Sequence, residues 1–235
     1  MRRITFILLF ISICTQVFAQ FSISEAEVLF QSRHTWRGTK FGTAPAIEPS
    51  ITATKGNFSF NVWASLTTNN TYSEIDLIPS WQFGEYTLSL YDYYNPVAAE
   101  KNGYLNLNSS ECRHSLEVSI DIFSGEKCPL KWYVGTFIAN DKNEETGKPY
   151  FSTYIELKYP FSFLKIDAEP FIGATPFKSF YADNLAIVNS GLALSKEIKL
   201  SKTLAIPVIL TYTFNPYTDN HFVTLGAGIA FTAGE

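Results

Sequence analysis

The chain lacks long apolar runs and carries few charges. Apart from the extreme N-terminus, no apolar stretch approaches the roughly 20 residues that a transmembrane helix needs, which excludes a helical multi-span transporter. Only 17% of the 235 residues are charged, against about 25% in soluble domains. The net charge of -4 and the lack of any Lys/Arg cluster argue against a nucleic-acid partner. The 16% aromatic content argues against disorder.

Residue types that carry catalysis and metal binding are also scarce. The chain has three His, and we expect His34, His114 and His221 to lie near one rim of the fold without a chemical role. His114 and Ser115 are neighbours on a strand, so they point to opposite faces and cannot form a Ser–His pair. The His and Cys residues show no metal-ligand spacing, and there is no Gly-rich phosphate loop. We therefore expect no enzyme activity, no cofactor and no metal site.

The first 19 residues have the layout of a cleaved secretory signal peptide. Arg2 and Arg3 precede an apolar stretch, and Ala19 closes a segment of small and apolar residues before Gln20. We expect residues 1–19 to be removed and residues 20–235 to form a single exported domain.

Apolar and polar residues alternate along the rest of the chain. In segment 58–67, for example, Phe58, Phe60 and Val62 share one face. This period of two predicts strands, and no window shows a sustained helical stripe. We expect about twelve strands, at 22–34, 46–54, 58–67, 72–82, 86–94, 114–123, 130–139, 150–158, 163–173, 184–196, 201–213 and 220–232. Each has about the 9–11 residues that cross a bilayer as a tilted strand, and either ten or twelve of them close the sheet.

The connections between these strands mostly alternate in length, with the loop 68–71 as the exception. Short turns are expected at 55–57, 83–85, 124–129, 159–162 and 197–200, and longer polar loops at 95–113, 140–149 and 174–183. Turns at one end and loops at the other are typical of an antiparallel up-and-down outer-membrane β-barrel. The loop 95–113 either folds inward as a constriction or only decorates the rim.

Charged residues within the strands lie on the face opposite the aliphatic residues. In a transmembrane barrel this polar face lines an aqueous lumen. The expected pore-lining residues are Glu74, Asp76, Glu117, Asp121, Lys131, Glu156, Lys158, Lys165, Asp167 and Glu169. Their acidic excess predicts a mild preference for cations or neutral solutes.

Aromatic residues concentrate near the strand ends, Trp36, Trp81 and Tyr93 among them. This placement is typical of the two aromatic girdles of a membrane barrel. Trp63 lies mid-strand on the polar face and is expected inside the lumen.

Four prolines fall inside expected strands, namely Pro49, Pro79, Pro170 and Pro207. Each removes a ladder donor and would normally mark an edge strand. Because a closed barrel has no edge, we expect bulges or local bends at these positions.

Cys112 and Cys128 flank the strand 114–123. About ten strand residues at roughly 3.3 Å each separate them, whereas a disulfide needs Cα atoms within about 7 Å. We expect both thiols to be free.

Several short motifs in the N-terminal half resemble the TorF-type porin family of outer-membrane proteins. They are Val28 to Gly38 with its Trp36-Arg37-Gly38 ending, Pro45-Ala46-Ile47, Phe60 to Ser65, Glu74 to Leu77, and Tyr91 to Pro96. The resemblance covers about the first 75 residues after the signal peptide. It implies a porin-like barrel and brings no substrate with it.

The resulting hypothesis is a monomeric barrel in the outer membrane of a Gram-negative cell, with membrane lipid and small polar solutes as its partners. Two alternatives remain open. One is a barrel plugged by side chains that serves as a structural or adhesive element. The other is a soluble exported β-sandwich that binds a ligand.

Overall fold

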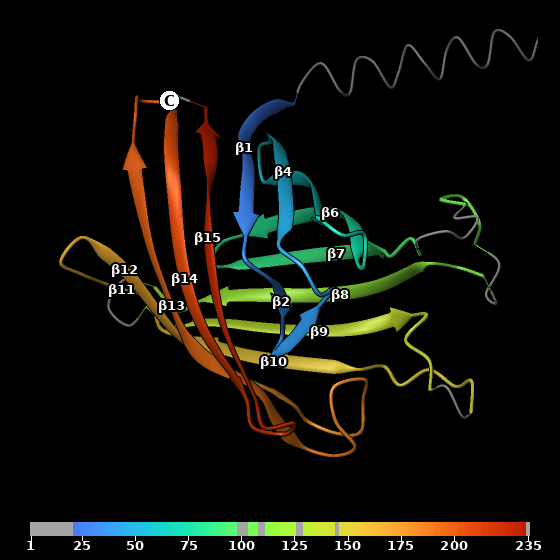
Figure 1. Cartoon of the computed structure of the whole chain (residues 1–235). Coiled ribbons are helices and arrows are strands. Elements are labelled where there is room, and N and C mark those ends of the chain that lie inside the picture. The colour runs from blue at the N-terminus through green and yellow to red at the C-terminus, as the bar shows by residue number, and fades with distance from the viewer. Residues whose placement is uncertain (1–20, 98–102, 108–110, 126–128, 144–145, 234–235) are drawn as a thin grey trace, which may run out of the picture.

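The computed structural model describes residues 21–97, 103–107, 111–125, 129–143 and 146–233, and these form one closed antiparallel β-barrel (Figure 1). The expected signal peptide lies outside the described residues. The wall strands are β1 (Ser22–Gln31), β4 (Ala46–Lys55), β5 (Phe58–Thr67), β6 (Ser73–Phe83), β7 (Tyr86–Tyr94), β8 (His114–Phe123), β9 (Lys131–Ala139), β10 (Thr153–Lys158), β12 (Ile166–Thr175), β13 (Ala186–Lys199), β14 (Leu204–Asn215) and β15 (Asn220–Thr232). The pairing of β1 with β15 and of β10 with β12 closes the ring at 12 strands. No helix among the described residues is long and apolar enough to span a membrane.

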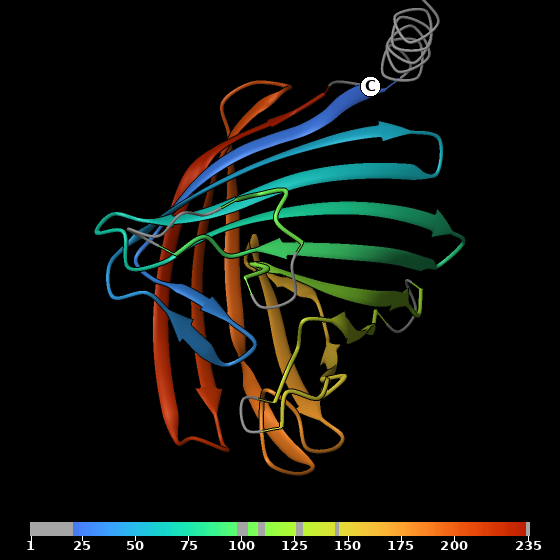
Figure 2. The same cartoon turned by 90° about the vertical axis from the view of Figure 1, so that its right-hand side faces the viewer.

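Three further strands are short. The strand β11 (Phe161–Phe163) pairs with β12 and continues the line of β10 along it. The strands β2 (His34–Trp36) and β3 (Thr39–Phe41) form a separate two-stranded sheet within the connection between β1 and β4. Figure 2 shows this hairpin inside the ring of wall strands.

The side chains of the wall alternate between two environments, as the sequence predicts. Outward positions such as Phe30, Leu88, Leu192 and Leu225 are apolar and exposed. Polar residues, including Glu117 at 0% exposure, occupy the inward positions. A wall that is apolar outside and polar inside is suited to lipid and not to water, so the fold is a transmembrane barrel.

The long connections of the barrel all lie at one end. The connections at the other end are residues 56–57, 84–85, 124–130, 164–165 and 200–203, and we call this side the short-turn end. The opposite side, here called the long-loop end, carries the long loops and also two short connections, residues 68–72 and 216–219. A cluster of exposed outward aromatic residues rings the short-turn end, comprising Trp81, Phe83, Tyr86, Trp132, Tyr159, Phe161, Phe163 and Phe231.

The turn expected at residues 159–162 is in a different place. Residues 161–163 are still paired with β12, and the chain reverses at Leu164 and Lys165, whose φ angles are 51° and 62°. Two successive left-handed residues make the tight hairpin turn that matches strand twist. Residues 159 and 160 only interrupt the pairing with β12 between β10 and β11.

The four strand prolines do not lie at bulges, which corrects one of the two irregularities expected there. Each proline is paired with one neighbouring strand, and the rungs toward its other neighbour are missing there. The register is the same before and after each gap. The shifts in register occur elsewhere, at Ile23/Glu25, Leu116/Glu117 and Gly173/Ala174. Each proline therefore leaves a gap in the ladder on one side without a shift in register.

Candidate functional site: a hairpin across the lumen

The β2–β3 hairpin turns at Arg37 and Gly38. Trp36 pairs with Thr39, so the turn has two residues, with φ angles of 46° and 76°. Both are left-handed, as a two-residue turn of this type requires. The geometry directs the Arg37 side chain away from the short hairpin and toward the opposite wall.

The Arg37 guanidinium forms a two-pronged ion pair with Glu117 of β8. Nη1 and Nη2 lie 2.6 and 2.7 Å from the two carboxylate oxygens. The two side chains are only 7% and 0% exposed. A bidentate Arg–carboxylate pair is strong and geometrically specific, so it fixes the hairpin tip against β8.

Tyrosines complete the surroundings of Arg37. Nη1 donates to the hydroxyl of Tyr181 at 2.5 Å, and Nη2 donates to that of Tyr133 at 2.6 Å. The guanidinium carbon lies 4.3 Å from the ring centre of Trp36 and 4.6 Å from that of Tyr154. Aromatic faces attract a cation, and more strongly once it is removed from water. The buried charge is thereby both hydrogen-bonded and stacked.

Gly38 lets the hairpin tip touch the wall on a second side. A Cβ atom at this position would lie 1.9 Å from the carbonyl oxygen of Val188 on β13. The Gly38 carbonyl accepts a hydrogen bond from Asn215 of β14 at 3.1 Å. With Glu117 on β8 and Val188 on β13 both in contact, the tip spans the lumen from one wall to another.

The base of the hairpin is held by Glu48 of β4. One carboxylate oxygen bonds to His34 Nδ1 at 2.8 Å and accepts from Ser65 at 3.3 Å, and the other accepts from Gln31 at 2.7 Å. His34 is only 6% exposed, and its ring stacks on Tyr72 with 5.4 Å between centroids. His34 therefore lies inside the barrel, which corrects its expected place at the rim.

Burial raises the pKa of two tyrosines on the loops. For Tyr181, removal from water raises the pKa above its usual range, against the opposing effect of Arg37. For Tyr72, burial raises the pKa, and the nearby Glu74 carboxylate raises it further. Both phenols stay neutral at ordinary pH, so Tyr181 can donate or accept beside the Arg37 cation.

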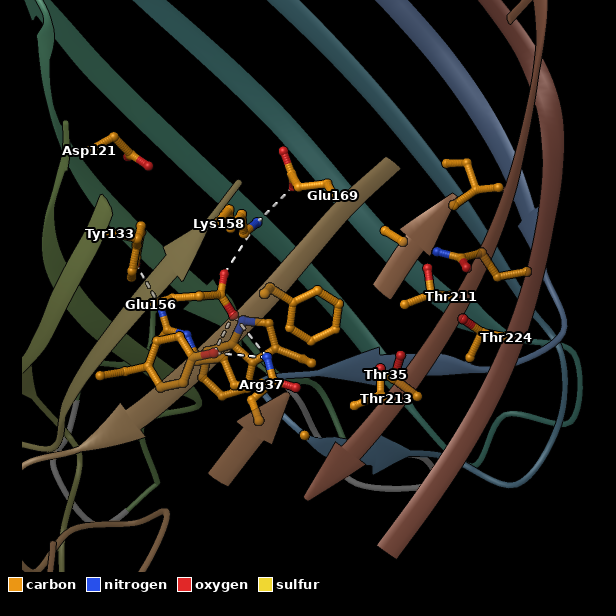
Figure 3. A pocket seen from close by; sticks show the side chains of 18 of the residues that line it. Thr35, Arg37, Asp121, Tyr133, Glu156, Lys158, Glu169, Thr211, Thr213 and Thr224 are labelled. Carbon is orange, nitrogen blue, oxygen red and sulfur yellow. Dashed lines mark hydrogen bonds and ion pairs between the residues drawn. The ribbon is translucent and has the colours of Figure 1, made fainter. Parts of the chain in front are cut away.

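Two cavities lie on either side of the hairpin, with Trp36 and Tyr93 lining both. The first, of about 470 Å³, is the short-turn cavity, and Arg37, Asp121 and Lys158 are among its lining residues (Figure 3). The second, of about 360 Å³, is the long-loop cavity, with Glu74 in its lining. The hairpin thus divides the lumen into two compartments instead of filling it.

The barrel can be compared with known structures at this point. A KdgM porin matches with a TM-score of 0.52, over 89% of this chain and 99% of that chain, at 7% sequence identity. The chain has the fold of an outer-membrane porin. A bacterial polysaccharide outer membrane secretin gives 0.42 at 8% identity, over 90% of this chain and 98% of that chain. The outer membrane protein opdK from Pseudomonas aeruginosa gives 0.34 at 10% identity, over 88% and 61%.

No protein-family model matches the chain, and no curated protein does. The porin likeness, at such low identity, is a likeness of fold.

The register places nine of the ten expected pore-lining residues on the inward face of the wall. Asp121, Glu156, Lys158 and Glu169 line the short-turn cavity. Around these four, Lys131 bonds to Glu169 at 2.8 Å, and Asp167 accepts from Ser162 at 2.5 Å nearer the short-turn end. Whether any of them lines a conducting path stays a prediction.

The other three inward carboxylates lie toward the long-loop end, and one expected residue is not inward at all. Glu74 accepts from Asn95 at 2.6 Å and from Tyr72, whereas Asp76 is 5% exposed and its Oδ1 has no partner among the described residues. Glu117 is the partner of Arg37. Lys165 is part of the turn between β11 and β12 and is exposed there. It lies at the mouth of the barrel, which corrects its assignment to the lumen wall.

Of the aromatic residues placed from the sequence, one lies where it was predicted and two do not. Trp63 is inward, with its ring centroid 5.4 Å from that of His34, as predicted. Trp36 and Tyr93 do not belong to a girdle, because their rings pack against each other inside the lumen at 5.9 Å. Their positions near strand ends were compatible with both places.

The described part of the loop 95–113 does not form the constriction. Tyr104 packs against Tyr94 and His114, and its carbonyl oxygen lies 2.6 Å from His114 Nε2. Tyr94 and His114 pair at the long-loop end on the outward face, where His114 also contacts Asp92 at 2.7 Å. Tyr104 therefore covers the outer side of the rim, whereas Asn95 faces the long-loop cavity. The segment that crosses the lumen is the β2–β3 hairpin of the first loop.

Arg37 is the residue of the candidate site that the sequence analysis missed. The available signal was the alternation of residues 34–41, where His34, Trp36, Thr39 and Phe41 flank an Arg-Gly pair. That pattern is typical of a short hairpin with a turn at Arg37 and Gly38. The hairpin was missed because the first expected strand was extended to residue 34.

Proposed function

We propose that the protein is an outer-membrane channel for passive diffusion of small polar solutes, narrowed by the hairpin that carries Arg37. The observation that carries this proposal is the pair of cavities on either side of a hairpin anchored to two walls. Barrels of about eight strands are filled by side chains, and those of about 16–18 hold wide pores. Twelve strands leave a lumen that one hairpin can narrow.

The membrane location is supported by the outer face of the wall. Exposed apolar side chains and the aromatic cluster at the short-turn end match a hydrocarbon layer and its interface. Short turns would then face the periplasm, and the long loops the outside. The expected result is a band in the outer-membrane fraction whose mobility changes on heating. Extraction without detergent would instead support a soluble protein.

A second candidate function is a plugged structural barrel. The observation in its favour is the completeness of the Arg37 contacts: Glu117, Tyr133 and Tyr181 all bond to the guanidinium. A hairpin held this firmly could close the lumen to every solute. The two functions differ in permeability and not in fold.

Liposome swelling separates these candidates. Purified barrel reconstituted in vesicles is exposed to glycerol, a monosaccharide and a trisaccharide. A narrowed channel admits the first two and excludes or slows the third. A plugged barrel admits none of them.

The matched control removes only the hairpin. Gln31 and Ala46 are paired across β1 and β4, so a two-residue Asn-Gly turn can replace residues 32–45 without changing the register. This variant should pass the trisaccharide. If it is as impermeable as the native chain, the hairpin is not the barrier.

A further inference from the structure

The short-turn cavity has one wall that carries threonine hydroxyl groups. Thr211 of β14 pairs with Thr224 of β15, and Thr213 lies one rung further along β14. Thr213 and Thr224 are each 4% exposed, and Figure 3 shows all three at the cavity. None of their hydroxyls forms a hydrogen bond with a described residue. Hydroxyls that line a cavity without a protein partner can donate to or accept from a solute held there.

The opposite wall is ionic, and its charges do not cancel. Arg37 is paired with Glu117. Lys158 lies between Glu156 and Glu169, with Nζ 3.2 and 3.6 Å from their carboxylates, and Lys131 also bonds to Glu169.

Asp121, which lines the same cavity, has neither an ion pair nor a hydrogen bond to a described residue. The two lysines balance the two glutamates, so the cavity keeps one unpaired carboxylate.

Aromatic rings form a third boundary. Trp36, Tyr91 and Phe171 also line the cavity. Cavities of about 300–1,000 Å³ with apolar surfaces and a few placed polar groups are typical of small-molecule sites. The short-turn cavity, at about 470 Å³, falls within that range.

We propose that the short-turn cavity binds a monosaccharide-sized polyhydroxylated solute that carries one positive charge, such as an amino sugar. The solute's hydroxyls bond to Thr211, Thr213 and Thr224, its C–H face packs on the rings, and its ammonium group pairs with Asp121. This inference names the solute class of the channel proposed above and rests on that proposal.

The test compares three sugars that share one ring and differ in charge. Glucosamine, glucose and glucuronate are titrated into the detergent-solubilised full barrel by calorimetry at about pH 6, where the amine is protonated and the carboxylate is ionised. Glucosamine should bind at least about tenfold more tightly than glucose, because its ammonium group adds a charged hydrogen bond to Asp121. Glucuronate should bind more weakly than glucose.

Variants assign this preference to the two walls. Asp121→Asn should abolish the advantage of glucosamine over glucose, whereas Asp219→Asn, an exposed loop carboxylate, should preserve it. Thr213→Val with Thr224→Val should weaken all three sugars by a similar factor, about three- to tenfold.

Equal binding of the three sugars, or a preference for glucuronate, overturns the inference. So does an unchanged preference in Asp121→Asn. These outcomes are independent of permeability: a barrel that passes solutes but does not discriminate among them retains the channel proposal, and one that binds glucosamine but passes nothing contradicts it.

Discussion

Replacing Arg37 with Met tests how firmly the hairpin is fixed. Met fills much of the aromatic cage but leaves Glu117, at 0% exposure, without its cationic partner. Breaking a buried ion pair by removing one partner costs about 3–5 kcal/mol. Met retains part of the packing against Trp36 and Tyr154, so we expect a loss of about 3 kcal/mol in the free energy of unfolding.

The assay is urea unfolding in lipid vesicles, followed by tryptophan fluorescence. Trp36 stacks on Arg37, so the signal includes the hairpin itself. The double variant Arg37→Met with Glu117→Gln should be more stable than the sum of the single losses implies, by about 2–3 kcal/mol, because the two residues are in contact.

The control for this series is Lys199→Met. Lys199 is 79% exposed and lies 3.9 Å from Glu197, and it should change stability by no more than about 0.5 kcal/mol. A loss in Arg37→Met as small as in this control, or simple additivity in the double variant, would refute the account of the hairpin.

Three other predictions follow from the same contacts. Gly38→Ala should cost about 1–3 kcal/mol more than Gly56→Ala in the same unfolding assay, because both have positive φ but only Gly38 meets a wall; equal losses would contradict this. Glu48→Ala should cost about 1–3 kcal/mol, since its three hydrogen-bond partners keep no acceptor, and an unchanged midpoint would argue against the anchored base. Cys112 has a free thiol, and Cys128 lies outside the described residues. After alkylation, mass spectrometry should find both cysteines labelled. A disulfide between Cys112 and Cys128 would contradict the topology.

The strands were the most predictable part of the fold. The ranges 58–67, 86–94, 114–123 and 220–232 match β5, β7, β8 and β15 to the residue. In these segments successive side chains face lipid and lumen in turn. The sequence of the segment alone therefore predicts which face each residue takes. Predictability falls where a residue's surroundings depend on distant strands.

Prolines show the limit of the local rule. A proline has no backbone N–H donor. The hydrogen bond is lost only toward the neighbouring strand that the proline nitrogen faces. Pro79 pairs with Phe60 on one side and interrupts the ladder to β7 on the other. The two strands keep their register across such a gap because the residue pairs before and after it still form.

The candidate site depends on contacts that no local pattern contains. Arg37 and Glu117 are 80 positions apart, and Gly38 and Asn215 are 177 apart. A carboxylate on the inward face of β8 could be predicted from alternation, and Glu117 was. The contact between Glu117 and an arginine of the first loop could not be predicted, because it depends on how the barrel closes.

Single-channel conductance in planar bilayers tests the central claim most directly. The native barrel should give small, steady conductance steps. The variant with an Asn-Gly turn in place of residues 32–45 should give steps several times larger, because its lumen has lost the hairpin that divides it. Equal steps from the two proteins, or none from either, would contradict a channel narrowed by the hairpin of Arg37.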